Sequence, residues 1–158
     1  MAIKQLMVGV DIMTDAGWSL YVGNIHAGSV QPTLIIYTKN SSVELTLDHL
    51  IKNGSVFIHA SSVAVGDILT GSEVTRIHNG TSHVTSPLTK SGTLVVNGFV
   101  LSCYANVYSH TVARISTLPV SAGIIANVSM YFQMLAGLYN NMPKFVRRTI
   151  AHDDVIYL

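Results

Sequence analysis

The sequence predicts an all-β domain followed by a helical extension, and three observations lead to this prediction. Up to about residue 118, short apolar runs rich in β-branched and aromatic residues alternate with Gly, Asn and Ser turns, which is typical of compact β folds and not of βαβ units. One arrangement of glycines and strands occurs in both halves of this region, and the apolar spacing becomes helical after residue 119. We therefore expect a β domain over 1–118 and a helix with a basic tail over 119–158.

The strands are predicted from apolar runs that end at turn residues. Asn-Gly pairs are strong hairpin signals, and they mark several of these ends. The predicted strands and the turns that bound them are Leu34–Thr38 and Val43–Leu47 around 39–42, Ser55–Ala60 after Asn53-Gly54, Val74–His78 before Asn79-Gly80, and Thr93–Asn97 and Phe99–Tyr104 around Gly98.

An internal repeat links the two halves of the predicted β domain. Val8–Thr14 is followed by Ile25–Gly28, and Val65–Thr70 is followed by Ile77–Gly80. Each copy reads as a glycine, a short apolar strand, a polar turn and a second apolar strand that ends in His-x-Gly. Self-similarity of this kind indicates two related structural units, so we expect a compact, pseudo-twofold domain of many short strands.

The last forty residues carry a different pattern. Val120–Leu138 has apolar residues three and four apart, Pro119 suits the first turn of a helix, and Asn140-Asn141 and Pro143 suit its end. Three cations follow, at Lys144, Arg147 and Arg148. An apolar helix followed by cations can lie on a membrane surface, but a helix packed on the β domain with a solvated tail is the interpretation that the residues favour.

Composition narrows the function classes. The chain has 158 residues, 49% hydrophobic and 11% charged, with a net charge of +1, so a single domain is expected and no basic field attracts nucleic acid. No apolar run is long enough to predict a transmembrane helix, and no secretory signal follows Met1. The seven histidines and one cysteine show no metal-ligand spacing, so we expect neither a metal nor a cofactor. Asn-x-Ser/Thr sequons occur at Asn40, Asn53, Asn79 and Asn127.

One short motif combines groups that can act on a peptide bond. Thr46-x-x-His49 lies at the end of a predicted strand, where a hydroxyl and an imidazole three residues apart can face one turn. The hydroxyl can hydrogen-bond an amide, and the imidazole can protonate a leaving nitrogen. On its own the motif is weak, because a lone histidine near a strand end is more often an ordinary polar residue.

A longer match gives this motif a context. Thr46, His49 and Leu50, the later Gly66-Asp67, and above all Pro87–Ala105, which contains the single cysteine, follow one another in the order of a known family. The sequence resembles the hedgehog-type Hint domain, a self-cleaving module, over roughly residues 3–118. The resemblance implies the Hint fold and an intramolecular reaction in which a cysteine attacks the preceding carbonyl, turning a peptide bond into a thioester that a second nucleophile resolves.

The resemblance also implies roles for four residues. Thr46 and His49 would bind and protonate the scissile amide, Cys103 would line the same pocket, and His26 stands where the family has an aspartate that activates the acceptor. The partner would be the chain's own upstream polypeptide segment. Sterol transfer, a sterol or membrane surface bound by the C-terminal helix, and a secretory or extracellular location are further implications.

This chain departs from the family pattern at its start. It begins Met1-Ala-Ile-Lys4 and has no counterpart of the leading strand and its cysteine. A thiolate is both a good nucleophile and a good leaving group, so we expect the 158-residue chain not to cleave itself. The alternative is a non-catalytic β module that keeps the Hint fold and binds a partner.

Overall fold

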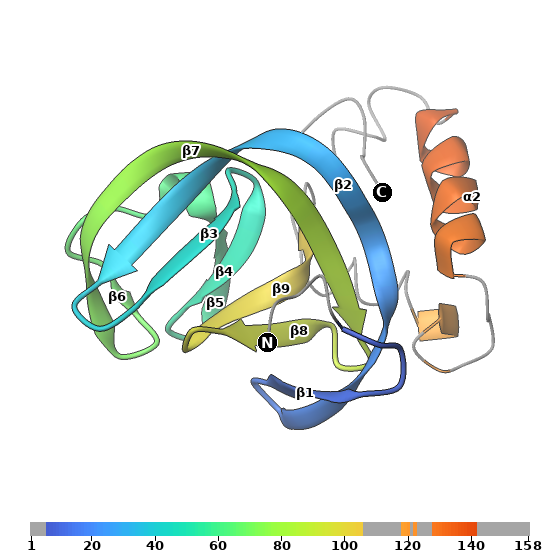
Figure 1. The fold of residues 1–158 in the computed structure, drawn as a ribbon, viewed down its shortest axis with the longest axis horizontal. Helices are drawn as coiled ribbons and strands as arrows, with labels where there is room; N and C mark the ends of the chain where they lie inside the picture. The colour runs from blue at the N-terminus through green and yellow to red at the C-terminus, as the bar shows by residue number, and fades with distance from the viewer. Residues whose placement is uncertain (1–5, 106–117, 121, 123–127, 142–158) are drawn as a thin grey trace.

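The protein is described here by a computed structural model, which covers residues 6–105, 118–120, 122 and 128–141 (Figure 1). The expected all-β domain is confirmed. Its elements are β1 (Asp11–Thr14), β2 (Gly17–Thr38), β3 (Ser42–Thr46), β4 (His49–Asn53), β5 (Val56–His59), a 3-10 turn at Ala60–Ser62, β6 (Ile68–Leu69), β7 (Ser72–Thr89), β8 (Thr93–Val96), β9 (Phe99–Ala105) and helix α2 (Val128–Asn140).

Two antiparallel sheets make up the β domain. The first has the order β1-β2-β7-β6, with β3 paired on β2, and the second has the order β5-β4-β9-β8. Figure 1 shows β2 and β7 as a long curved ribbon that arches over the second sheet. Asp15 links the turn after β1 to the second sheet, because it accepts hydrogen bonds from Lys52 Nζ at 3.0 Å and Thr93 Oγ1 at 2.6 Å.

Two strands are much longer than the short strands that the sequence predicts. β2 has 22 residues and β7 has 18, and their pairing shifts register at four places. Such bulges bend and twist a strand pair, which allows the ribbon to curve. The predicted turn at Asn79-Gly80 is wrong, because both residues lie inside β7, opposite Leu34 and Thr33. Gly80 serves a close approach instead, since a Cβ there would lie 2.8 Å from Thr33 Oγ1.

The hairpin turns agree better with the sequence. β2 and β3 pair around residues 39–41, β4 and β5 meet at Asn53-Gly54, and β8 and β9 meet at Asn97-Gly98. Asn97 and Gly98 both have positive φ, at 50° and 87°. A two-residue turn with two positive φ angles matches the twist of the strands on either side.

The internal repeat is a structural repeat. Gly9 and Gly66 have φ angles of 91° and 96°, and each donates its backbone N–H to the long strand that follows, Gly9 to Tyr21 at 2.9 Å and Gly66 to Val74 at 2.8 Å. The returning N–H groups of Tyr21 and Val74 both donate at 2.8 Å to the residue after each glycine. β1–β2 and β6–β7 are therefore equivalent units, and their long strands pair with each other, as a pseudo-twofold arrangement requires.

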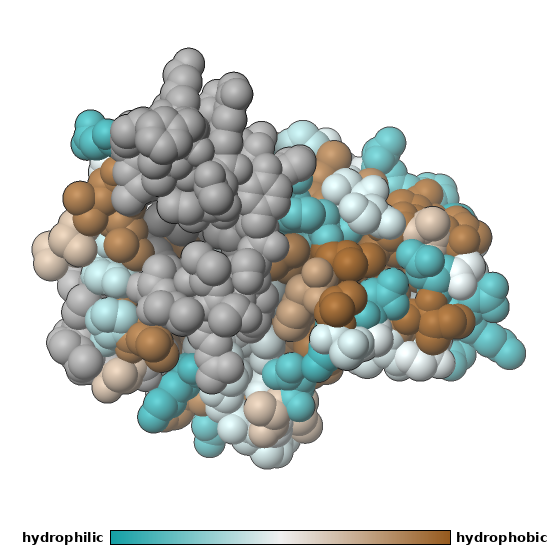
Figure 2. All heavy atoms as spheres, turned by 180° about the vertical axis from the view of Figure 1, so that it is seen from behind, coloured by the Kyte–Doolittle hydropathy of each residue, from teal (hydrophilic) through white to brown (hydrophobic). Residues whose placement is uncertain are grey.

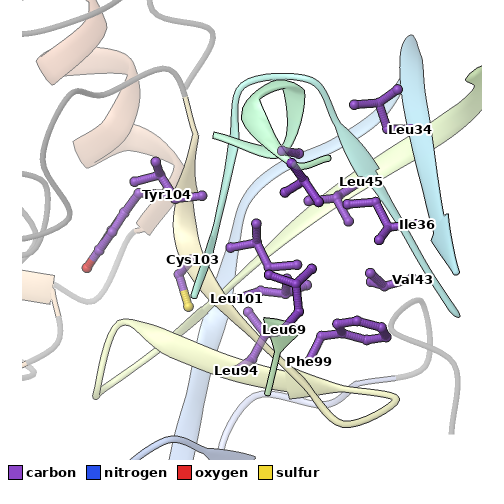
Figure 3. Packing of buried hydrophobic residues seen from close by; sticks show 14 of the residues in the cluster. Leu34, Ile36, Val43, Leu45, Leu69, Leu94, Phe99, Leu101, Cys103 and Tyr104 are labelled. Carbon is purple, nitrogen blue, oxygen red and sulfur yellow. The ribbon is translucent and has the colours of Figure 1, made fainter. Parts of the chain in front are cut away.

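The core lies between the curved ribbon and the second sheet (Figure 3). Its fully buried side chains come from both sheets, and the largest of them are Ile36, Ile51, Leu69, Leu88 and Val74. Alternation along β3 produces this packing, because Val43 and Leu45 are buried while Glu44 between them is exposed. Glu44 and Thr46 therefore share the other side of β3.

Helix α2 confirms that the chain becomes helical after the β domain. It begins at Val128 and ends at Asn140, and the N–H of Asn141 still bonds the carbonyl of Gly137 at 3.2 Å. The predicted earlier turns lie partly outside the described residues, as does the basic cluster at 144–148. Figure 1 shows α2 beside β2, and Tyr131 is buried there. Within the described segments, no helix is long and apolar enough to span a membrane.

Candidate functional site

Thr46 and His49 lie at the two ends of a tight connection between the sheets. Thr46 is the last residue of β3 in the first sheet, and His49 is the first residue of β4 in the second. Only Leu47 and Asp48 separate them, so the chain must turn sharply between the two residues. The T-x-x-H spacing thus keeps the two residues near each other by local geometry alone.

The two residues line one cavity of about 310 Å³. Its wall is formed by β3 and β4, by the 82–87 stretch of β7, and by apolar residues of the second sheet. The lining residues are Thr33, Val43, Glu44, Leu45, Thr46, His49, Ser82, His83, Val84, Thr85, Ser86, Pro87, Leu94, Val96 and Leu101. Most of this lining is apolar or uncharged, although Glu44 and His83 are exposed, so the cavity is a partly open hollow in which a peptide amide can reach both Thr46 and His49.

His49 is held as a neutral imidazole. Its Nε2 lies 2.9 Å from the backbone carbonyl of Ser102, and because a carbonyl only accepts hydrogen bonds, Nε2 carries the hydrogen. Burial lowers the pKa of His49 to about 4, although the bond to the Ser102 carbonyl raises it in part. At neutral pH the proton is therefore on Nε2, and Nδ1 offers a lone pair.

A register shift in the second sheet directs the Ser102 carbonyl toward His49. His49 pairs with Ala105, whereas Ile51 pairs with Leu101, so β9 uses four residues where β4 uses two. The N–H of Tyr104 turns back to Ser102 Oγ at 3.0 Å within this irregular stretch. Irregularities of this kind re-aim backbone and side chains near functional sites.

The same register shift decides where Cys103 lies. Its sulfur contacts Thr89 Oγ1 at 3.6 Å, its N–H bonds the carbonyl of Gly92 at 2.9 Å, and its side chain is 1% exposed. Figure 3 shows it on β9 beside the core, and it is not among the residues that line the cavity. Cys103 thus lies outside the described lining of this cavity, and its expected place in the pocket of Thr46 and His49 stays a prediction. Burial raises the pKa of its thiol to about 11, so it is a poor nucleophile.

His26 is placed by its backbone. It lies in β2 opposite Ser86 of β7, and Ser86 lines the cavity. The pairing near it is irregular, since the register shifts between Asn24 and His26 and again between Ala27 and Ser29. The structure thus places the strand position of His26 next to the cavity wall, while the predicted role of its imidazole stays a prediction.

The sequence gives no direct signal for a third polar group, the carboxylate of Glu44. Thr33 Oγ1 donates to Glu44 Oε1 at 2.7 Å, and Ser82 Oγ donates to the same oxygen at 2.6 Å. These two hydrogen bonds, that of Ser82 first, lower the pKa of Glu44. The three residues come from three strands and are 11 and 38 positions apart, so only the folded chain brings them together.

The described residues contain no cluster of three or more His, Cys, Asp or Glu side chains that could hold a metal ion. His78 and His83, the histidines that flank a predicted turn, lie in β7 instead. His78 packs edge-on against Tyr37, and His83 Nδ1 lies 3.3 Å from the Gly28 carbonyl. Each of these two histidines thus has a structural neighbour.

Comparison with known structures agrees with this architecture. The gp41-1 intein superposes with a TM-score of 0.58 at 11% identity, covering 65% of this chain and 86% of the intein. The VidaL intein, as its selenomethionine variant, gives a TM-score of 0.51 at 14% identity, covering 58% and 68% of the two chains. These likenesses show a shared fold. A family model described as the Hint module matches residues 5–150, nearly the whole chain, so the chain belongs to the Hint module family.

Proposed function

We propose that this Hint module performs intein-like autoprocessing, with Thr46 and His49 activating the scissile amide of an attached polypeptide. The observation that carries the proposal is the pair itself: a hydroxyl and a neutral imidazole line one cavity, and the imidazole is fixed by the Ser102 carbonyl. A fixed, desolvated imidazole is suited to proton transfer, because its orientation is set before the reaction begins.

His49 acts first as a base and then as an acid in the proposed reaction. As a thiol attacks the scissile carbonyl, Nδ1 takes the thiol proton, and the C–S bond forms. The same proton then passes to the amide nitrogen as the C–N bond breaks, which leaves a thioester and a free amine. Nε2–H keeps its bond to the Ser102 carbonyl throughout, which stabilises the imidazolium that forms for a moment. Thr46 Oγ1 hydrogen-bonds the amide and orients it.

The attacking thiol in this scheme is not Cys103. That residue is buried in β9 with a pKa raised to about 11, and it is the single cysteine of the 158 residues. We therefore expect the chain Met1–Leu158 to remain intact when treated with thiols. A mass spectrum showing fragments after thiol treatment would contradict this expectation.

The direct test joins a Gly-Cys strand with a reporter peptide upstream of residue 1 and follows its cleavage by dithiothreitol. Cleavage at the new Gly-Cys bond supports the autoprocessing function. His49→Ala in this fusion should slow cleavage by roughly a hundredfold or more, the usual size of a general acid–base contribution. Cys103→Ala serves as the matched control, because removing a core thiol should leave the rate within a few-fold.

Two outcomes of that test separate the candidate functions. A fusion that folds but shows no cleavage favours the alternative, a non-catalytic interaction module that keeps the Hint fold. Cleavage that does not respond to His49→Ala removes His49 from the mechanism. A circular dichroism spectrum equal to that of the original chain establishes that the fusion is folded.

The acceptor and the location belong to the proposal as well. His26 would act as the base for an acceptor hydroxyl, supported by the place of its backbone opposite Ser86.

A sterol or membrane surface would bind helix α2. There Met130, Met134 and Leu138 form an exposed stripe, each four residues after the last, and Figure 2 shows apolar atoms on the side where α2 lies. Flotation with anionic vesicles, lost on Met134→Glu, tests this surface. A secretory location is tested by glycosidase treatment of the expressed protein, since Asn40 lies exposed in the turn after β2.

A further inference from the structure

We propose that Glu44, an exposed residue of the cavity wall, is a binding site for a protonated amine or guanidinium, and that it recognises the polypeptide on which the domain acts. The inference rests on the proposed function only in naming the processed polypeptide as the source of the cation. The binding itself can be measured in the 158-residue protein without any cleavage.

The first argument is the orientation of the carboxylate. Thr33 Oγ1 at 2.7 Å and Ser82 Oγ at 2.6 Å both donate to Oε1 of Glu44. Across the described parts of the chain, no side chain or backbone group donates to Oε2. Two hydroxyls thus fix the carboxylate through one oxygen and present the other. A carboxylate that is ionised and fixed in this way accepts strong, charge-assisted hydrogen bonds from cationic donors.

The second argument is that β7 carries a glycine, Gly80, where it comes close to the Glu44 carboxylate. A Cβ on Gly80 would lie 2.8 Å from Thr33 Oγ1 and 3.2 Å from Glu44 Oε1. A larger residue at position 80 would therefore force Thr33 Oγ1 to shift and would crowd the carboxylate that it holds. The close approach of β7 and this carboxylate therefore depends on a glycine in the middle of a strand, a position where glycine is otherwise unfavourable.

The third argument is charge. Among the described residues that line the cavity, Glu44 is the only Asp, Glu, Lys or Arg. The one ion pair found among the described residues joins Lys52 to Asp15 elsewhere. His49 is neutral at pH 7 because burial lowers its pKa to about 4, and His83 lies against the Gly28 carbonyl. Within the described part of the chain, no lysine or arginine pairs with this carboxylate, and a cationic ligand would complement its charge.

The fourth argument is the position of Glu44 relative to the reacting groups. Glu44 and Thr46 are two residues apart on one strand, so their side chains leave β3 on the same side, about 7 Å apart. Two cations can reach this place. One is a lysine or arginine side chain next to the scissile bond. The other is the amine that the acyl shift frees when the C–N bond breaks and the thiol proton moves to nitrogen, which then takes one more proton from water.

The experiment titrates the 158-residue protein with three short peptides and follows its amide NMR signals. The first peptide, Gly-Ala-Leu amide, carries only an α-ammonium group. The second, acetyl-Ala-Lys-Leu amide, carries only a lysine side chain, and the third, acetyl-Ala-Ala-Leu amide, is neutral. We expect saturable shifts at Thr33, Thr46 and His49 with at least one charged peptide and none with the neutral one. The charged peptide that binds identifies the source of the cation.

Two carboxylate variants make the test specific. Glu44→Gln should weaken binding at least fivefold, because it removes the charge and keeps the shape. Glu73→Gln is the matched control, since Glu73 is an exposed residue of β7 that is not among the residues lining the cavity. This variant should bind the charged peptides as tightly as the original protein does. If Glu44→Gln disturbs the fold, the salt dependence of the original protein gives the same information, because binding to a carboxylate weakens as ionic strength rises.

The proposal is overturned if Glu44→Gln binds the charged peptides as well as the original protein does, or if neither charged peptide shifts the cavity signals up to its solubility limit. Binding that is independent of salt overturns it as well. A fusion protein that fails to cleave does not touch these results, so the failure of the autoprocessing function and the failure of the cation site are distinguishable.

Discussion

At the scale of single residues, His49 couples the cavity to the pH dependence of folding. Its pKa is about 4 in the folded protein, whereas the ordinary value for histidine is 6.5, so between these two pH values the unfolded chain binds more protons. The stability that neutral His49 contributes is therefore complete above pH 6.5 and is lost as the pH falls toward 4. The free energy of unfolding should drop by about 2 kcal/mol between pH 8 and pH 5 from this group.

Urea unfolding across this pH range measures the effect. His49→Gln keeps an N–H donor for the Ser102 carbonyl but cannot titrate. Between pH 8 and pH 5 its free energy of unfolding should therefore fall by about 2 kcal/mol less than that of the original protein. Thr46→Val, a non-titrating neighbour in the same cavity, is the control and should keep the pH dependence of the original protein. A His49→Gln curve parallel to that of the original would contradict a lowered pKa.

Cys103 gives a second prediction at this scale. With a pKa raised to about 11, only about a thousandth of the thiol is ionised at pH 8, and the side chain is buried as well. Ellman's reagent should therefore react at least a hundredfold more slowly with the native protein than with the protein in urea, where one thiol per chain should appear. Equally fast labelling in both states would show that β9 opens readily or that Cys103 is accessible.

The candidate site was predictable where its geometry is local. Thr46 and His49 are close because only two residues separate them, and this spacing is visible in the sequence. The surroundings of Cys103 could not be read from the sequence, because the register of β9 against β4 shifts by two residues, and nothing in the run of apolar letters marks that shift. Glu44 could not be found either, because its partners Thr33 and Ser82 lie on other strands.

At the scale of elements, β7 carries a prediction that tests why it contains a glycine. Gly80→Ala places a methyl group 2.8 Å from Thr33 Oγ1, so we expect a loss of about 1–3 kcal/mol from overpacking. Gly137→Ala is the matched control: it lies in α2 with open space around it, and the same change in a helix should stabilise by up to about 1 kcal/mol. Thermal unfolding of both variants measures the difference. Equal melting temperatures would mean that Gly80 is not needed for the close approach.

The elements also show how far local signals determine strand ends. Asn97-Gly98 is a turn, whereas Asn79-Gly80 is not, although the two pairs are identical in sequence. The flanking apolar runs do not show which Asn-Gly pair forms a turn, because strand pairing decides it. β7 continues through Asn79-Gly80 along the 22-residue strand β2, and the hydrogen bonds between these two strands outweigh the turn preference. Tertiary pairing of this kind overrides local propensity.

At the scale of the whole molecule, the two repeats form one cooperative unit because their long strands pair with each other. β2 and β7 pair along nearly their full lengths, so neither half can unfold and leave the other with its sheet intact. Trp18 lies at the start of β2, near β1, and its fluorescence reports the first repeat, while circular dichroism reports all strands. The two signals should give the same urea midpoint, as expected for a two-state domain.

The equivalent glycines of the repeats allow a sharper version of this prediction. Gly9 and Gly66 have nearly the same positive φ, and a Cβ would meet nothing within 4 Å at either site. Alanine at each position therefore pays only for its backbone conformation, about 1–2 kcal/mol, and the two costs should be similar. Because the repeats unfold together, Gly9→Ala, in the repeat that contains Trp18, and Gly66→Ala, in the other repeat, should lower the fluorescence midpoint equally. A Gly66→Ala variant whose fluorescence midpoint stays fixed while its circular dichroism midpoint falls would show that the halves unfold separately, and the pseudo-twofold unit would then be two weakly coupled parts.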